Sequence, residues 1–262
     1  MMRENAVKRA LQAGETVVGV FQPIPAPALT EVFGLVGFDF AILDAEHGPA
    51  AVETCEALIR SADAVNLPTI IRIAENTPQN ILRYLDAGAL GVQIPMVNNA
   101  ALARAVVDSV KYPPVGKRGL AAVRANGHGL TGPLGDYTRL ANAETLVVVQ
   151  IETREAIGNL DEIMAVEGVD VIFIGPNDLS TSLGHPGEPE NPGVQEIIGG
   201  LIERIHAAGK VSGTIAYDSR AVTRAKARGI RYIAGGAVPL LAGASRAYLQ
   251  EVRAPTTPPI PA

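Results

Sequence analysis

The 262-residue sequence has one cysteine, Cys55, and no tryptophan, and aromatic residues make up only 4% of it. A single cysteine excludes an intrachain disulfide and is typical of a reducing compartment, so we expect a cytoplasmic protein. Within "VETCEALIRSA" we expect the thiol to pack inside the fold, because free cysteine is usually buried.

Long apolar runs and an excess of basic charge are also missing. No segment reaches the roughly 20 apolar residues of a membrane-spanning helix, and the apolar run in "MMRENAVKRALQAGETVVGVF" is too short for a signal peptide. The net charge is −5, the pI is about 5.5, and the Lys and Arg residues are scattered. The sequence therefore predicts small-molecule partners, with neither nucleic acid nor membrane among them.

Several catalytic motifs are absent. No G-x-G-x-x-G follows a predicted strand, and there is no Walker loop, no serine or cysteine nucleophile elbow and no tightly spaced histidine cluster. These absences argue against a nucleotide cofactor, against covalent catalysis of the hydrolase type and against a structural zinc site.

What the sequence does contain is a regular alternation of short β-branched runs with helical patterns, in a chain that is 47% hydrophobic. Eight strand and helix units predict one closed (β/α)8 barrel over residues 1–253, because open parallel sheets usually have fewer strands. The predicted strands are residues 16–21, 40–47, 69–74, 91–97, 145–152, 169–176, 211–217 and 230–236. The predicted helices are residues 27–37, 51–65, 77–88, 100–112, 155–168, 194–210, 219–229 and 239–252.

Two segments stand outside this alternation. Residues 113–144 are rich in glycine and proline, which predicts a long loop with at most one short helix, placed to cover the site or a neighbouring subunit. Residues 254–262, "APTTPPIPA", are proline-rich and predict a disordered tail.

Two predicted strands end in acids. In "VVVQIETREAIGNL" the alternation puts Val148, Gln150 and Glu152 on one face, and "VDVIFIGPNDLS" leads to Asp178. Neighbouring strands lie ~5 Å apart, so the two carboxylates can converge, where they would repel, raise one pKa or hold a cation. Either acid alone could be a helix cap, but the pair favours a divalent cation such as Mg²⁺, Mn²⁺ or Co²⁺.

The second predicted strand ends in "ILDAEHGP", which contains Asp44, Glu46 and His47. An imidazole at this rim could transfer a proton to or from a substrate. The alternative is that His47 is a turn residue and that the acids cap the next helix.

Arg72 interrupts the apolar run "TIIRIAEN". A buried guanidinium needs an anionic partner, which could be a substrate carboxylate or, structurally, Asp44 or Glu46. Asp86 in "RYLDAGA" stands at a helix carboxyl end, where the helix dipole disfavours an anion. It could face a cation or histidine, or simply be solvated.

Gly175 and Pro176 could let the backbone pass close to a ligand, and the amides of Asn177 and Asp178 could bind an anion. By itself "GPND" indicates only a loop.

Five segments, in order, carry a family resemblance: "FDFAILDAEHGP", "IIRIAENTPQNILRYLDAGALGVQIPMV", "KYPPVGKRGL", "VVVQIET" and "VDVIFIGPNDLSTSLGHPG". Together they resemble the HpcH/HpaI aldolase family of metal-dependent class II pyruvate aldolases over residues 16–250. The resemblance implies a (β/α)8 barrel of the phosphoenolpyruvate/pyruvate-binding type and a carbon-carbon lyase that needs a divalent cation and no organic cofactor.

The resemblance also implies roles for individual residues. Glu152 and Asp178 would hold the metal, Arg72 would grip the oxo acid, and Gln150 would line the pocket. The oxo-acid carboxylate would bind the backbone amides of residues 175–178. Proton transfer would involve His47, Asp44 and an Asp86 contributed by an adjoining subunit. Members commonly form hexamers, as trimers of dimers that exchange the last helix, here residues 239–252.

The resemblance leaves the reaction open. The segment "FQPIPAPALTE" resembles a branch that includes a siderophore-associated citrate synthase, and Arg124 or His128 in "RGLAAVRANGHG" could bind an extra substrate carboxylate or lie in a solvated loop. The first hypothesis is reversible cleavage of a 4-hydroxy-2-oxo acid to pyruvate and an aldehyde. The second is condensation of an enolate with oxaloacetate or another oxo acid, and the third is a silent barrel that serves as a binding module.

Overall fold

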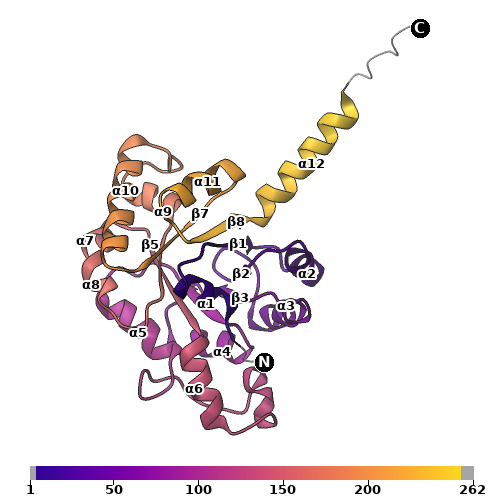
Figure 1. The fold of residues 1–262 in the computed structure, drawn as a ribbon, viewed down its shortest axis with the longest axis vertical. Helices are drawn as coiled ribbons and strands as arrows, with labels where there is room; N and C mark the ends of the chain where they lie inside the picture. The colour runs from indigo at the N-terminus through magenta and orange to yellow at the C-terminus, as the bar shows by residue number, and fades with distance from the viewer. Residues whose placement is uncertain (1–3, 255–262) are drawn as a thin grey trace.

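The computed structural model describes residues 4–254, in which eight parallel strands close into a barrel in sequence order (Figure 1). Closure is made by β1, which pairs with β2 on one side and with β8 on the other. The predicted (β/α)8 barrel is therefore confirmed. The strands are β1 Val17–Gln22, β2 Phe40–Asp44, β3 Thr69–Arg72, β4 Gly91–Ile94, β5 Leu146–Ile151, β6 Val171–Ile174, β7 Val211–Ile215 and β8 Tyr232–Gly236.

Most helices follow a strand, and several begin where a side chain caps the first turn or where proline is the first residue. Thr77 accepts a hydrogen bond from the Asn80 amide at the start of α4, and Asp218 accepts one from Ala221 at the start of α11. The helices are α1 Ala6–Gln12, α2 Pro27–Leu35, α3 Val52–Ala64, α4 Pro78–Asp86, α5 Ala100–Val110, α6 Leu134–Glu144, α7 Arg154–Gly158, α8 Leu160–Met164, α9 Pro176–Ser182, α10 Pro192–Ala207, α11 Ser219–Ala227 and α12 Ala237–Arg253.

The structure differs from the sequence-based expectation in four places. The first is α1, which precedes β1 where no helix was predicted. Residues 113–144 contain both α6 and a 3₁₀ turn, η1 Arg124–Gly129, where the prediction had one short helix at most. Residues 155–168 are divided between α7 and α8 at Asn159. "GPND" does not stay a loop, because Pro176 has the fixed φ of a first helical residue and opens α9.

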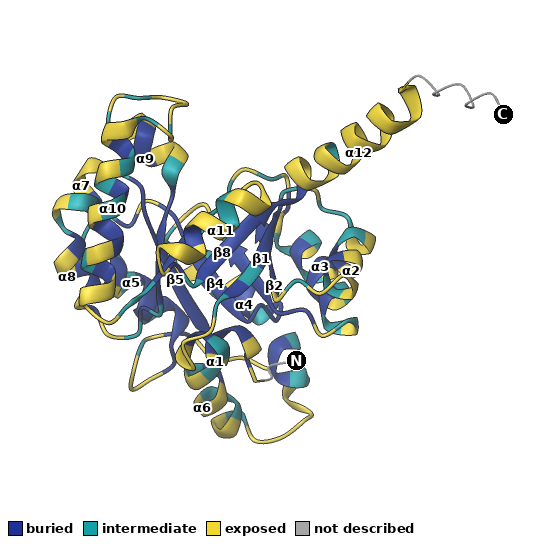
Figure 2. Cartoon of the chain, turned by 45° about the horizontal axis from the view of Figure 1, so that its top comes forward, coloured by how far each residue is buried: buried dark blue, intermediate teal, exposed yellow. Residues whose placement is uncertain are grey.

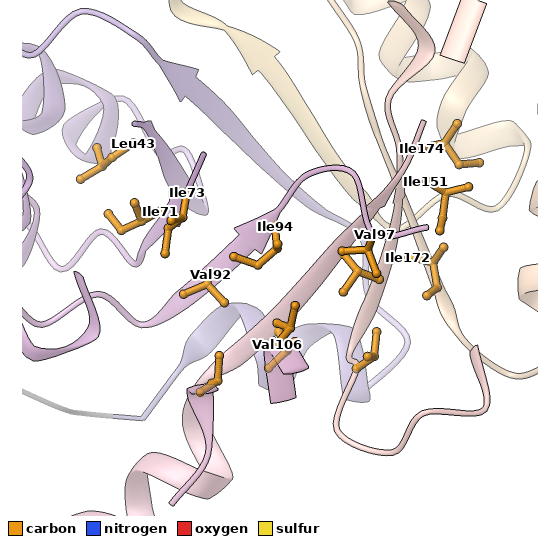
Figure 3. Packing of buried hydrophobic residues seen from close by; sticks show 14 of the residues in the cluster. Leu43, Ile71, Ile73, Val92, Ile94, Val97, Val106, Ile151, Ile172 and Ile174 are labelled. Carbon is orange, nitrogen blue, oxygen red and sulfur yellow. The ribbon is translucent and has the colours of Figure 1, made fainter. Parts of the chain in front are cut away.

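The alternation of side chains along each strand separates two cores. On β5, Val147, Val149 and Ile151 pack outward against the helices, whereas Leu146 and Val148 pack inside the barrel. Buried strands enclosed by half-buried helices are visible in Figure 2, and Figure 3 shows part of the outer core, with residues of β4 beside α5. Gln150 and Glu152 share the face of Val148 and therefore point into the barrel.

Aromatic rings fill the floor of the barrel interior. Phe40 stacks on Tyr232 with ring centroids 4.5 Å apart, and Phe173 meets Tyr232 edge-on at 6.2 Å. Gly213 leaves room for these rings, since a Cβ there would lie 2.9 Å from the Tyr232 ring. These rings close the floor of the barrel interior, below the carboxyl ends of the strands.

The last helix, α12, does not lie against the barrel. It projects away from the strands in both views (Figures 1 and 2), and only Ala237 of its residues is buried. Its exposed large apolar residues are Val238, Leu240, Leu241, Tyr248, Leu249 and Val252. The predicted tail lies outside the described residues beyond Ala254.

Among the described helices, none combines the length and the apolar character that crossing a bilayer requires.

Candidate active site

A cavity of about 400 Å³ opens at the carboxyl ends of the strands. In a (β/α)8 barrel this is the face where catalytic residues gather. Most of the predicted site residues line it, namely Asp44, His47, Arg72, Gln150, Glu152, Gly175, Pro176, Asn177 and Asp178. The structure therefore places side chains from β2, β3, β5 and α9 around one space.

The two acids reach the cavity from different positions. Glu152 directly follows β5, as expected, but Asp178 lies in the first turn of α9 rather than at the end of β6. Gly175 allows the two segments to approach, because a Cβ at that position would lie 2.7 Å from Glu152 Oε2. A side chain at 175 would push the carboxylate out of place.

The Glu152 carboxylate is buried and accepts two hydrogen bonds. The Met96 amide donates to Oε1 and the Gln150 amide donates to Oε2, each at 2.7 Å. Burial raises the pKa of Glu152 to about 6, the two hydrogen bonds oppose the shift, and the nearby charge of Asp178 adds to it. Met96 has a φ of +55°, so a sparsely populated backbone conformation aims its amide at this acid.

Arg72 is held against Asp44 by a bidentate contact. Nε donates to Oδ1 at 3.0 Å and Nη2 donates to Oδ2 at 2.6 Å. Burial favours a higher pKa for Asp44, but the hydrogen bonds and charge of Arg72 outweigh it, so the pKa lies below its usual value. The structural salt bridge considered for Arg72 is present. Within the described residues Nη1 donates to no protein atom, so this donor is left for a ligand.

His47 and Glu46 stand at the rim. The imidazole Nε2 of His47 is 3.9 Å from Glu46 Oε2, and the ring is largely exposed. Burial raises the pKa of Glu46 despite the nearby charge of Arg72, whose Nε is 3.3 Å away. The contact between His47 and Asp44 runs through the backbone amide of His47 and Asp44 Oδ1, not through the ring.

Two predicted site residues do not line the cavity within one protomer. Asp86 ends α4, at the opposite end of the barrel, and pairs with Arg118 at 2.7 Å. Arg124 donates to Asp63 at 2.6 Å and to the Ala87 carbonyl at 2.7 Å. Its side chain is mostly buried, so the alternative of a solvated loop does not describe it either. His128 lies in η1, near Arg124.

One wall of the cavity was not predicted. It is lined by residues from the ends of β1 and β7 and from the first turn of α12, namely Phe21, Ile215, Tyr217, Val238 and Pro239. The Phe21 ring lies beneath Arg72, with the guanidinium carbon 4.7 Å from the ring centroid. Their positions at or just after strand ends could have predicted that these residues face the site. The predicted site residues were mainly charged or polar, whereas these side chains are uncharged.

The donor set fits a hard divalent cation. Within the described residues no group of three or more histidine, cysteine or acidic side chains converges, so a cage made wholly of protein ligands is not offered. Two carboxylates in a partly open cavity are what Mg²⁺ or Mn²⁺ accepts, because such ions keep positions for water and substrate oxygens. A cation would also offset the repulsion that contributes to the raised pKa of Glu152.

The chain matches the family model described as HpcH/HpaI aldolase/citrate lyase over residues 17–239. It is 38% identical over 245 residues to the pyruvate aldolase of Rhizobium etli, covering 93% of this chain and 95% of that protein. Among solved structures, an HpcH/HpaI aldolase/citrate lyase family protein from Burkholderia cenocepacia has a TM-score of 0.90 and 32% identity, covering 95% of this chain and all of that one. The citrate synthase SbnG has a TM-score of 0.82 and 30% identity, with 94% and 97% of the two chains covered.

Proposed function

The chain belongs to the HpcH/HpaI aldolase/citrate lyase family, and from this premise we propose that it is a metal-dependent carbon-carbon lyase that reversibly cleaves a 4-hydroxy-2-oxo acid to pyruvate and an aldehyde. The observation that carries the proposal is the meeting of two acids, Glu152 and Asp178, with the anchored arginine Arg72 in one cavity. A silent binding module has no use for this arrangement, because buried charges cost free energy.

Glu152 and Asp178 are the residues that would hold Mg²⁺, Mn²⁺ or Co²⁺. When bound, such a cation supplies Lewis-acid stabilisation of the negative charge that develops on the oxo acid. Gln150 fixes the Glu152 carboxylate from the side of the barrel interior. The backbone amides of Asn177 and Asp178 would provide donors for the oxo-acid carboxylate, because Pro176 has no N–H and the amide of Gly175 donates to the Ile151 carbonyl. No organic cofactor is needed.

Arg72 binds and orients the oxo acid. Asp44 fixes two of its guanidinium nitrogens, so the group is pre-organised and Nη1 can donate to an oxygen where charge accumulates. In the cleavage direction His47 takes the proton from the C4 hydroxyl, the C3–C4 bond breaks with its electrons entering the enolate, and a proton added at C3 gives pyruvate.

The wall of Phe21, Ile215 and Val238 would receive the aldehyde part of the substrate. Because this wall carries no charged side chain, it favours an uncharged aldehyde. The similarity to the citrate synthase SbnG supports the second candidate, condensation of an enolate with oxaloacetate or another oxo acid.

Three measurements on the same protein separate these candidates. With Mn²⁺, proton NMR should show deuterium exchange into the methyl group of pyruvate, and a chelator should stop it. Pyruvate release from a 4-hydroxy-2-oxo acid supports the aldolase, and citrate formation from oxaloacetate supports the condensing enzyme. Exchange that continues with chelator present would contradict the role of the metal, and loss of all three activities would leave the binding module.

The projecting α12 supports an exchange of this helix between two protomers. In a (β/α)8 barrel the helix after the last strand packs on the outside of the barrel, yet α12 leaves Leu241, Tyr248 and Val252 in solvent. On α2, Val32 and Leu35 are exposed as well, and so is Val36, which caps the end of this helix. A partner's α12 would cover such surface, in dimers that assemble as a hexamer.

The assembly can be tested by light scattering after size-exclusion chromatography. The unaltered chain should elute as a hexamer, and Leu241→Glu with Tyr248→Glu should give smaller species, since two charges would be buried in the exchanged interface. An unaltered chain that remains monomeric at micromolar concentration would contradict the exchange. The cytoplasmic location belongs to the proposal too, supported by the single buried Cys55.

A further inference from the structure

A chain of buried polar side chains runs from the cavity into the interior of the barrel. Gln150 Nε2 donates to Glu152 Oε2 at 2.7 Å, and Gln93 Nε2 donates to Gln150 Oε1 at 2.6 Å. At the far end the Tyr232 hydroxyl donates to Gln93 Oε1 at 3.4 Å. All four side chains are buried, and Gln93 and Tyr232 are fully so. Amides in this position are tolerated only when their groups are paired.

The chain of hydrogen bonds has one direction while Glu152 is ionised. A carboxylate only accepts, so Gln150 must turn its nitrogen toward Glu152 and its oxygen toward Gln93. Gln93 must then turn its nitrogen toward Gln150, which leaves its own oxygen facing Tyr232. The hydroxyl closes the chain by donating. Flipping either amide would bring two oxygens face to face.

The position of the last donor is fixed by packing. The Tyr232 ring lies between Phe40, stacked at 4.5 Å, and Phe173, edge-on at 6.2 Å. Gly213 provides the space for this ring, as its missing Cβ would lie 2.9 Å away. Tyr232 reaches Gln93 from β8 across the interior of the barrel, since Gln93 lies on β4. The hydroxyl therefore has little freedom to find another partner.

We propose that Gln93 and Tyr232 are positioning residues for the metal site. They orient the Gln150 amide, which holds the Glu152 carboxylate in the position that a divalent cation requires. The inference rests on the proposed function, because it assumes that Glu152 is a metal ligand. It adds two residues that touch neither metal nor substrate. Partners in the shell behind a metal ligand typically change metal affinity by roughly 10- to 100-fold.

The test measures Mn²⁺ affinity directly, from the electron paramagnetic resonance signal of free Mn²⁺. Tyr232→Phe keeps the ring and should raise the Kd about threefold, and Gln93→Met should raise it about tenfold, since it removes the donor to Gln150 itself. Tyr112→Phe is the matched control, because it also removes a buried hydroxyl but lies outside the cavity and the chain. Its Kd should equal that of the unaltered protein.

The double variant Gln93→Met with Tyr232→Phe distinguishes a general loss of protein stability from a loss of the position of the Glu152 carboxylate. This variant has no stranded Tyr232 hydroxyl, so it should be more stable to urea than Gln93→Met while its Mn²⁺ affinity stays as weak. Affinity that recovers with stability would overturn the inference, as would unchanged affinity in both single variants. Failure of the unaltered protein to bind Mn²⁺ would instead reject the proposed metal site together with this inference.

Discussion

Buried ionisable side chains have different partners at the two ends of the barrel. At the base, Lys111 Nζ donates to the carbonyls of Asn142 and Thr145, each at 2.8 Å, and Lys8 pairs with Asp170 at 3.0 Å. At the mouth, Glu152 carries a raised pKa and faces a second acid. At the base these amines donate to carbonyls and to Asp170 and so hold α1 and α5 in place, whereas at the mouth the charge of Glu152 is partly uncompensated because Asp178 lies nearby. Partly uncompensated charge thus marks the end at which we propose that ligands bind.

The largest expected effect is at the mouth, with Glu152→Gln. We expect Mn²⁺ affinity to fall by more than about 100-fold, beyond the loss typical of groups behind a ligand. The free energy of unfolding without metal should not fall, because the lost charge was disfavoured by burial. Titration with Mn²⁺ and urea unfolding of the same sample check both parts. A variant that binds Mn²⁺ normally would break the comparison.

Arg72→Lys should lower the rate of deuterium exchange into pyruvate by roughly 100-fold, the loss typical of removing one donor to a developing oxyanion. Lysine keeps the charge but cannot make the bidentate contact with Asp44. Arg60→Lys is the matched control, because Arg60 is exposed and pairs with Glu56 on α3. Equal exchange rates in the two variants would remove Arg72 from the reaction.

At the base, Lys111→Met should cost stability and leave exchange unchanged. The carbonyl of Asn142 loses its donor, so we expect a loss of about 2 kcal/mol at pH 9.

The loss should depend on pH. Burial and the nearby Lys8 lower the pKa of Lys111 to about 7 from 10.5 in the unfolded chain. Between these values the unfolded chain binds more protons, so the contribution of Lys111 to stability grows as pH rises from about 7 to 10 and is smallest below 7. Urea unfolding of both proteins at pH 7, 8 and 9 checks this. A difference that shrinks with rising pH would contradict the neutral amine.

The smallest effect is expected from Arg124→Gln. Its contacts with Asp63 and the Ala87 carbonyl should be worth about 1 kcal/mol of stability, and the range of aldehydes accepted should stay the same. Comparing initial rates with several aldehydes tests this. If the variant accepted a different range of aldehydes, the base of one protomer would contribute to the cavity of a neighbouring protomer, and the two ends of the barrel would not be functionally separate.

The barrel could be predicted because its signals are local. The β-branched runs and the helical patterns alternate along the sequence. In a (β/α)8 barrel the carboxyl ends of all strands lie at one rim, so the acids and Arg72 could be placed together without knowledge of individual contacts. Asp178 was placed at the correct rim but in the wrong element, since Pro176 opens a helix that the four letters "GPND" do not reveal.

What the sequence could not supply are contacts between distant residues of the barrel. Tyr232 and Gln93 are 139 positions apart and meet only after the barrel closes. Arg124 finds Asp63, 61 positions away, and that partner decides its role within the protomer. The projection of α12 also leaves no local signal, because its pattern is that of an ordinary amphipathic helix.

One helix connects the rim of the cavity with the outermost part of the molecule. Val238 and Pro239 line the cavity, and the same helix continues to Arg253, a rod of about 26 Å at 1.5 Å per residue. Because a helix is stiff, a small change in the direction of its far end also changes the direction of its first turn, which lines the cavity. If Tyr248 contacts another protomer, that contact sets the direction of α12 and therefore the position of Val238 and Pro239 at the cavity. The selectivity for the aldehyde would then depend on the assembly and not on one chain alone.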